Sequence, residues 1–251
     1  MKINYFIKLL FLSYIFVNSN LMAETVFFDS KNIKIEDKGN MVFATQGVAK
    51  IPTKKLNIEG EKFVYDKKNS ELTIFDNVKY LDKENNLIIE TQKLIYNEID
   101  NTIMSYSETL IKMEDKYEIN SFDVMFERNL KKISSKNLTE VNDKINNKFI
   151  FEDGLIFDNK NEIIYSTKSS IIDQNLNKYF FEYSKINLKT NEIAGKEIKI
   201  DFENSFFGNA DNDPLLKGSS IISNDNNTKI YKTVFSTCST ENKNCRGWEL
   251  Q

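Results

Sequence analysis

The chain has 251 residues, a formal net charge of −3 and no histidine. The absence of histidine removes the commonest general base, the commonest metal ligand and every Ser-His or Cys-His nucleophile pair. Lysines alternate with acids along the chain and form no basic stripe of the kind that nucleic-acid-binding proteins carry. We therefore expect a protein that is not an enzyme, binds no nucleic acid and uses no cofactor or metal.

The N-terminal segment 1–23 has the composition of a secretory signal peptide. Lys2 and Lys8 accompany an apolar run from Leu9 to Val17, and Ala23 is the small residue expected at a cleavage point. The run is far shorter than the roughly twenty residues that a membrane-spanning helix needs. We expect an exported protein whose mature part begins at Glu24, and a retained N-terminal anchor is the alternative.

A repeat of thirty or thirty-one residues organises the rest of the chain. Segments of eight residues with a common pattern start at positions 29, 59, 90, 120, 151 and 182. The fifth and seventh positions of each segment are apolar, and residues two apart on a strand point to the same face. Each copy therefore offers one apolar pair to a shared interior. The pairs are Ile33 and Ile35, Phe63 and Tyr65, Leu94 and Tyr96, Val124 and Phe126, Leu155 and Phe157, and Ile186 and Leu188.

Turn-forming residues separate these segments from further short strands. Asn, Asp, Lys and Gly follow the copies, as in 37–40 and 158–161, and runs such as 41–45, 72–75 and 163–165 come next. Short strands at roughly ten-residue intervals are typical of all-β sandwiches, barrels and solenoids. We predict an all-β fold over 24–236, an open antiparallel β-jellyroll of stacked repeats. A parallel β-helix is the alternative, and the small number of glycines disfavours it.

Both cysteines of the chain, Cys238 and Cys245, lie in the C-terminal segment 237–251. In an exported protein such a pair is first of all a disulfide candidate. A local Cys238–Cys245 bond and bonds to cysteines further along a longer chain are both possible. A metal site is the weakest interpretation, because two thiolates without histidine leave the coordination incomplete.

The repeats and the C-terminal motifs together resemble the N-terminal periplasmic (OstA/LptA-like) domain of the outer-membrane lipopolysaccharide assembly protein LptD, whose repeats are shared with LptA and LptC. The motifs are Asp213-Pro followed by Lys217-Gly, then Thr237-Cys, Cys245 and Trp248-x-Leu. The resemblance covers the mature chain. It departs from the family in having no cysteine near residue 24, and the sequence up to residue 251 contains no outer-membrane barrel. The segment 237–251 would then be a linker toward a possible C-terminal β-barrel, or the chain is a barrel-less relative.

The resemblance implies a periplasmic protein, associated with the cell outer membrane, that binds and conducts the acyl chains of lipopolysaccharide. The six apolar pairs would line its groove, with Phe63, Tyr65, Tyr96, Phe126 and Phe157 as the strongest candidates for lipid contact. Ordinary packed core is an equally good interpretation of each pair. The implied partners are lipopolysaccharide, LptA-like jellyrolls docked by their edge strands and, in a full-length protein, the barrel with its LptE-like lipoprotein plug. Long-range disulfides from the two cysteines would tie the domain to that barrel.

Two alternative functions remain open at this point. The chain could be a free LptA/LptC-like component of a periplasmic lipopolysaccharide bridge. Less favoured is a β-solenoid surface protein or carbohydrate-active protein, because the acids mostly lie in turns or alternate outward on strands and do not converge in pairs.

Overall fold

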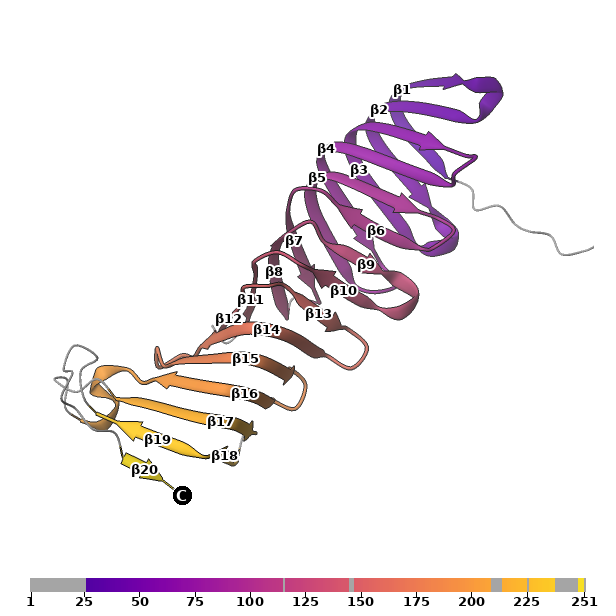
Figure 1. Cartoon of the computed structure of the whole chain (residues 1–251). Coiled ribbons are helices and arrows are strands. Elements are labelled where there is room, and N and C mark those ends of the chain that lie inside the picture. The colour runs from indigo at the N-terminus through magenta and orange to yellow at the C-terminus, as the bar shows by residue number, and fades with distance from the viewer. Residues whose placement is uncertain are drawn as a thin grey trace, which may run out of the picture.

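The computed structural model describes residues 26–114, 116–144, 147–208, 214–224, 226–237 and 248–250. The described chain is built from strands joined by tight turns and single 3-10 turns (Figure 1). The strands are β1 (Phe27–Glu36), β2 (Met41–Ile51), β3 (Leu56–Asp66), β4 (Glu71–Asp82), β5 (Leu87–Asn97), β6 (Thr102–Ser105), β7 (Glu108–Met113), β8 (Tyr117–Phe122), β9 (Met125–Glu127), β10 (Lys132–Ser135), β11 (Thr139–Asp143), β12 (Lys148–Phe151), β13 (Leu155–Asp158), β14 (Ile163–Ile172), β15 (Lys178–Asn187), β16 (Glu192–Asp201), β17 (Leu215–Ser223), β18 (Thr228–Tyr231), β19 (Thr233–Ser236) and β20 (Trp248–Leu250). The 3-10 turns are η1 (Asp37–Gly39), η2 (Pro52–Lys54), η3 (Arg128–Leu130) and η4 (Asn204–Phe207).

All described strands belong to one continuous antiparallel sheet. We call the stretch of chain from one turn to the next, across the full width of the sheet, a pass. Each pass pairs with the pass before it and the pass after it, so the strands stack in chain order along an elongated molecule (Figure 1). The described pairings are antiparallel from β1–β2 through β19–β20. The predicted all-β, open antiparallel jellyroll is confirmed, and the parallel β-helix alternative is wrong. One repeat of about thirty residues corresponds to two passes.

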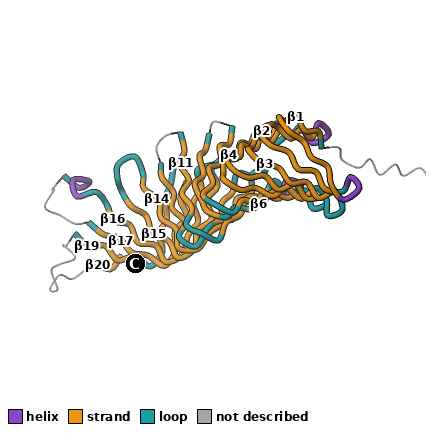
Figure 2. The backbone as a smooth tube through the Cα atoms, turned by 90° about the horizontal axis from the view of Figure 1, so that it is seen from above, coloured by secondary structure: helices purple, strands orange, loops and turns teal. Residues whose placement is uncertain are grey.

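Each pass bends near its middle and contributes to two layers that face each other. We call layer A the half-passes next to the turns at 37–40, 67–70, 98–101, 128–131, 159–162 and 188–191, and these turns lip A. Layer B consists of the half-passes at the opposite ends of the passes. Its turns lie at 52–55, 83–86 and 173–177, at Glu114 and Lys116, and at Lys144 and Asn147, and these turns form lip B. Figure 2 shows the bent passes with their turns in two rows. The two lips border the open side of the jellyroll.

The bends form where the backbone leaves ordinary strand geometry. Gln46, Asp123, Lys168 and Glu197 have φ between 44° and 55° at the middle of their passes. A residue in the left-handed region interrupts the alternation of a strand, so the buried positions switch between even and odd numbers across the bend. In β2, for example, Val42 and Ala44 are buried before the bend, and alternate residues up to Ile51 after it.

Buried hydroxyls fill the inside of the bends. The Thr91 hydroxyl lies 2.7 Å from that of Ser107, and the Ser169 and Ser184 hydroxyls are also 2.7 Å apart. Ser105 accepts a hydrogen bond from the backbone N–H of Val124 at 2.9 Å. Ser105 thus satisfies a backbone N–H at the bend, and the paired hydroxyls satisfy each other, which is the requirement for burying polar groups.

Recurrent Asx turns end many of the passes. The Asp158 carboxylate accepts the backbone N–H groups of Lys160 and Asn161 and the side-chain amide of Asn161. Asp66 with Asn69 and Asp82 with Asn85 make the same contacts. The Asp/Asn-rich segments of the sequence therefore form tight turns through side-chain bonds to their own backbone.

The inner faces of both layers carry unbroken apolar rows. Residues that are directly opposite on neighbouring strands share a face, so the register traces each row along the molecule. The layer A row is Ile35, Val42, Tyr65, Leu72, Tyr96, Ile103, Phe126, Ile133, Phe157, Ile164, Ile186 and Ile193. The layer B row is Phe28, Ala49, Ile58, Tyr80, Ile89, Ile111, Ile119, Val141, Phe149, Ile171, Tyr179, Ile200, Leu216 and Phe235.

The two layers are offset along the stack. The Phe28 ring, in the layer B half of β1, packs 5.9 Å from the Phe63 ring and 6.3 Å from the Tyr65 ring, both in the layer A half of β3. A layer B half-pass therefore faces a layer A half-pass two or three passes further along the chain. Within the described residues, the layer A half of β1 consequently has no layer B half-pass opposite it, and Ile33 and Ile35 are 50% and 63% exposed.

Several sequence predictions concern segments at the chain ends. The expected signal peptide 1–23 and the two cysteines lie outside the described residues. Within the expected linker 237–251, Trp248–Leu250 form β20, which pairs with β19. Among the described residues, no helix has the length and apolar character needed to span a membrane.

Candidate functional site

The interior of the jellyroll is filled at its N-terminal half. Tyr80, Tyr96, Phe63 and Phe126 are each at most 1% exposed and belong to one continuous core. Burying an aromatic or large aliphatic side chain in this way stabilises the fold by about 1.5–3 kcal/mol per residue. The apolar rows are packed core in this half.

In the C-terminal half, the space between the layers opens into a cavity of about 500 Å³. Its layer B wall comes from β8, β11, β12, β14 and β15, and its layer A wall from β15 through β18. The layer A wall comes from strands later in the chain than those of the layer B wall, because the two layers are offset. The apolar lining consists of Phe149, Ile171, Tyr179, Phe181, Ile186, Leu188, Ile193 and Ile221.

Polar residues of both lips surround this cavity. Lys116 and Lys144 come from lip B and are exposed. Asn191 comes from lip A, and Asn187 is the last residue of β15, next to that lip. Two carboxylates, Asp143 and Asp173, complete the rim. The cavity therefore has an apolar floor and a polar edge of mixed charge, which suits a molecule with an apolar body and a polar head.

The two rim carboxylates are occupied by the turns that contain them. Asp173 accepts the backbone N–H groups of Asn175 and Asn177, the Asn177 amide at 2.9 Å and the Tyr179 hydroxyl at 3.1 Å. Asp143 accepts the backbone N–H and the side-chain amide of Asn147, at 2.9 and 2.8 Å. Within the described ranges, no group of three His, Cys, Asp or Glu side chains is arranged to hold a metal ion.

Two half-buried tyrosines at the edge of the cavity have raised pKa values. Burial, and then the negative charge of Asp173, raise the pKa of Tyr179 to about 12. Burial also raises the pKa of Tyr117 to about 12, and Glu162 adds to this effect. Both hydroxyls are therefore neutral hydrogen-bond donors at physiological pH.

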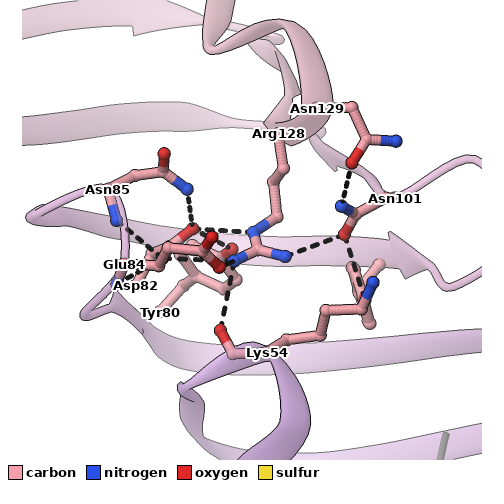
Figure 3. Close-up of polar contacts among 9 residues, drawn as sticks. Lys54, Tyr80, Asp82, Glu84, Asn85, Asn101, Arg128 and Asn129 are labelled. Carbon is pink, nitrogen blue, oxygen red and sulfur yellow. Dashed lines mark hydrogen bonds and ion pairs between the residues drawn. The ribbon is translucent and has the colours of Figure 1, made fainter.

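A buried ion pair joins the two lips on the N-terminal side of the cavity (Figure 3). Arg128, at the start of η3 in lip A, reaches the carboxylate of Asp82, the last residue of β4 in layer B. The Arg128 Nε donates to the Asp82 Oδ2 at 2.7 Å, and both side chains are at most 2% exposed. We call this pair the lip bridge.

Further polar groups complete the lip bridge. The Arg128 guanidinium also donates to the Asn101 Oδ1 at 2.9 Å and to the carbonyl oxygen of Lys54 at 3.2 Å. The Tyr80 hydroxyl donates to the Asp82 carboxylate at 3.2 Å, and the Tyr96 hydroxyl donates to Asn101 at 3.3 Å. Lys54 belongs to lip B and Asp82 to the adjoining end of layer B, whereas Asn101 belongs to lip A, so the network fastens one lip to the other (Figure 3).

The lip bridge shifts the ionisation of its members. Burial alone would raise the pKa of the Asp82 carboxyl, but hydrogen bonds from Arg128 and Asn85 and the charge of Arg128 outweigh burial and lower it. Burial disfavours the Arg128 cation, yet its bond to Asp82 raises the pKa of Arg128 above its usual value. Both groups are therefore charged at neutral pH, as a buried pair of this geometry requires.

A second contact between the lips lies closer to the cavity. Glu162, in lip A, accepts bonds from the Lys116 ammonium at 3.4 Å and from the Tyr117 hydroxyl at 3.5 Å. The Lys116 side chain is 47% exposed, so this contact is weak in water. A smaller space of about 280 Å³ lies between the two lips, between this contact and the lip bridge.

The predicted groove residues fall into three groups. Ile186 and Leu188 line the cavity. Ile33 and Ile35 lie on the inner face at the exposed N-terminal end. The remaining eight are buried in the core: Phe63, Tyr65, Leu94, Tyr96, Val124, Phe126, Leu155 and Phe157.

Sequence reasoning did not identify the layer B wall of the cavity or the lip bridge. The layer B residues could have been found, because alternate apolar residues such as Phe149 and Phe151 precede each predicted pair. The sequence features that indicate the lip bridge are weaker than those that indicate the layer B residues. Arginine occurs only at 128 and 246 in the sequence, and Asp82 follows the alternating apolar positions Val78 and Tyr80.

Comparison with known proteins adds no family assignment. A scan against protein-family models finds no match, and a search of curated proteins also finds none.

Proposed function

We propose that this protein is a carrier for the acyl chains of lipopolysaccharide, an exported and non-catalytic binding protein that acts in the periplasm at the outer membrane. The observation that carries the proposal is the cavity between the layers, because an inner apolar row of the jellyroll leads into an open space at Ile186 and Ile193. Its volume of about 500 Å³ falls in the range of about 300–1,000 Å³ that small-molecule sites occupy.

The energetics of hydrocarbon transfer support such a site. Each methylene removed from water contributes about 0.8 kcal/mol, so an acyl chain of a dozen carbons gains on the order of 10 kcal/mol by entering an apolar groove. Phe149, Ile171 and Phe181 on one wall face Ile186 and Ile193 on the other. The lysines and asparagines of the rim would contact the polar head of the lipid.

The chemistry of the rim favours binding over catalysis. Paired carboxylates that hydrolyse glycosides need one free acid and one free base in a cleft. Asp143 and Asp173 instead accept several hydrogen bonds from their own turns. Partners of this carrier would include LptA-like jellyrolls at its ends and, in a longer chain, an outer-membrane barrel with its lipoprotein plug.

Photo-crosslinking in living cells tests the proposal. A photoreactive residue at Phe181 or at Ile193 is expected to capture lipopolysaccharide, because both side chains line the cavity. The same residue at Lys62, whose side chain is 66% exposed in a surface ion pair, is the matched control and is expected to capture none. Capture only at Lys62, or at no position in a protein whose thermal melt is unchanged, would contradict the proposal.

A further inference from the structure

The apolar character of the inner rows does not explain why the cavity ends on its N-terminal side. The inner row of layer A continues without a polar interruption from Ile193 back through Ile164, Phe126 and Ile103 to Ile35. Ile103 and Ile193 therefore belong to the same row of the same layer, but Ile103 is 1% exposed whereas Ile193 lines the open cavity. Something other than side-chain polarity closes the interior around Ile103.

Two contacts between the lips lie over this closed part of the interior. The lip bridge holds lip A at η3 against the end of β4, and the Tyr80 and Tyr96 hydroxyls beneath it donate into the same network. The cavity lies on the C-terminal side of both the lip bridge and the Glu162 contact, and its walls reach no residue before Lys116.

We infer that the lip bridge is a latch that sets how far an apolar chain can enter the interior of the jellyroll. While Arg128 holds Asp82, the interior beneath the bridge is packed and the groove begins beyond it. When the bridge opens, lips A and B separate at η3, and the apolar rows beneath it become accessible. The weak Glu162–Lys116 contact still lies between this part of the interior and the cavity. The groove then lengthens toward the N-terminal half.

The geometry suits a latch better than a general stabilising contact. A buried pair costs desolvation free energy that a hydrophobic pair of the same volume would not cost, so it adds little net stability in comparison with apolar packing. The ion pair does fix the position of one lip relative to the other, because the Arg128 guanidinium must bind Asp82, the Lys54 carbonyl and Asn101 at the same time. The latch's effect on an entering apolar chain rests on the proposed function, whereas the access that it controls is measured without lipid.

Thiol labelling measures whether the bridge controls access. The two native cysteines are replaced by serine, and single reporters are introduced as Ile103→Cys and Ile193→Cys, which are matched in residue type and in row. Labelling by N-phenylmaleimide is followed by mass spectrometry. With Arg128 present, the Ile103→Cys reporter is expected to react at least about tenfold more slowly than Ile193→Cys, because labelling requires local opening.

Two variants then open the latch. Arg128→Met removes the cation, and Asp82→Asn removes the charge but keeps an oxygen that can accept the bonds of its turn. In each, Ile103→Cys labelling is expected to accelerate at least about tenfold while Ile193→Cys labelling is unchanged. Circular-dichroism melts confirm that each variant is folded at the labelling temperature, and Asp82→Asn serves where Arg128→Met does not fold. Protection of Ile103→Cys in a folded variant, or equal acceleration of both reporters, would overturn the inference.

Discussion

Ile33 lies directly opposite Ala44 in the β1–β2 pairing, yet Ile33 is 50% exposed and Ala44 is 2% exposed. Directly opposite residues share a face of the sheet, so Ile33 points toward the interior at a position where layer B does not cover it. Ile35, opposite Val42, is in the same situation. Among the described strands, the offset of the layers thus leaves an apolar inner surface uncovered at β1, which pairs with β2 along one side and is an edge of the sheet.

We expect the double substitution Ile33→Asp with Ile35→Asp to suppress end-to-end association and to leave the fold intact. Both side chains are at least half exposed, so the change in unfolding free energy should stay below about 1 kcal/mol. Sedimentation velocity over a concentration series measures the association. Ile99→Asp, at a residue that is 72% exposed in a turn, is the control for added charge. Unchanged association of the double variant, in conditions where the parent protein associates, would contradict this expectation.

The sequence was sufficient to predict the strands, their phase and the stacking of the repeat. The apolar pairs determine which face of each half-pass turns inward, and Asp and Asn in the connecting segments form the turns through bonds such as those of Asp158. These features depend on residues that are neighbours in the sequence or one repeat apart. Local pattern therefore carries them.

The offset of the layers and the limits of the cavity could not be predicted in this way. Each strand of a sheet is rotated relative to its neighbours, so the offset is a property of many strands together and no single residue encodes it. It decides that Phe28 meets Phe63, that Arg128 meets Asp82, and that Ile186 lines a cavity. Arg128 and Asp82 are 46 positions apart, which is not a multiple of the repeat, so the periodicity that revealed the fold gave no reason to pair them.

Removal of Arg128 should destabilise the protein strongly. In Arg128→Met the buried Asp82 carboxylate loses its partner, and breaking a buried pair in this way costs about 3–5 kcal/mol. Urea unfolding of the parent, of Arg128→Met, of Asp82→Asn and of the double variant forms a thermodynamic cycle. We expect the double variant to be less destabilised than the sum of the single variants, because neither residue then leaves a buried charge unpaired. Strict additivity would show that the two side chains are not coupled.

Stability at low pH should depend on Asp82. The pKa of this carboxyl is lowered in the folded protein, so its contribution is fully present above the unfolded-state value of about 3.9. The contribution decreases as pH falls from there through the lower folded-state pKa. The difference in unfolding free energy between the parent and Asp82→Asn should therefore shrink below about pH 4. Asp153→Asn, at a surface ion pair in which both side chains are about half exposed, should differ little from the parent at either pH.

Tyr179 should ionise late in an alkaline titration. Its pKa is about 12 in the folded protein against about 10 in an unfolded chain, so the unfolded state loses its proton first. The resulting stabilisation is fully present below about pH 10 and is lost as pH rises toward 12. Phenolate absorbance of the parent minus that of Tyr179→Phe isolates this residue. A difference curve with its midpoint near pH 10, recorded while circular dichroism shows a folded protein, would contradict the placement of Tyr179 beside Asp173.

A substitution in the core should reduce stability, whereas a substitution in the cavity wall should reduce lipid binding. Phe126 is fully buried, and Phe126→Ala should cost about 3–5 kcal/mol of unfolding free energy. Ile193 is only partly buried at the cavity wall, so Ile193→Asp should cost less stability but place a charge where an acyl chain would lie. We expect Ile193→Asp to reduce lipopolysaccharide binding by at least about tenfold, and folded Phe126→Ala to bind as the parent does. Binding is measured on purified protein at a temperature where both variants are folded. The reverse result, with binding lost in Phe126→Ala and kept in Ile193→Asp, would place the lipid in the N-terminal half, where the parent interior is packed.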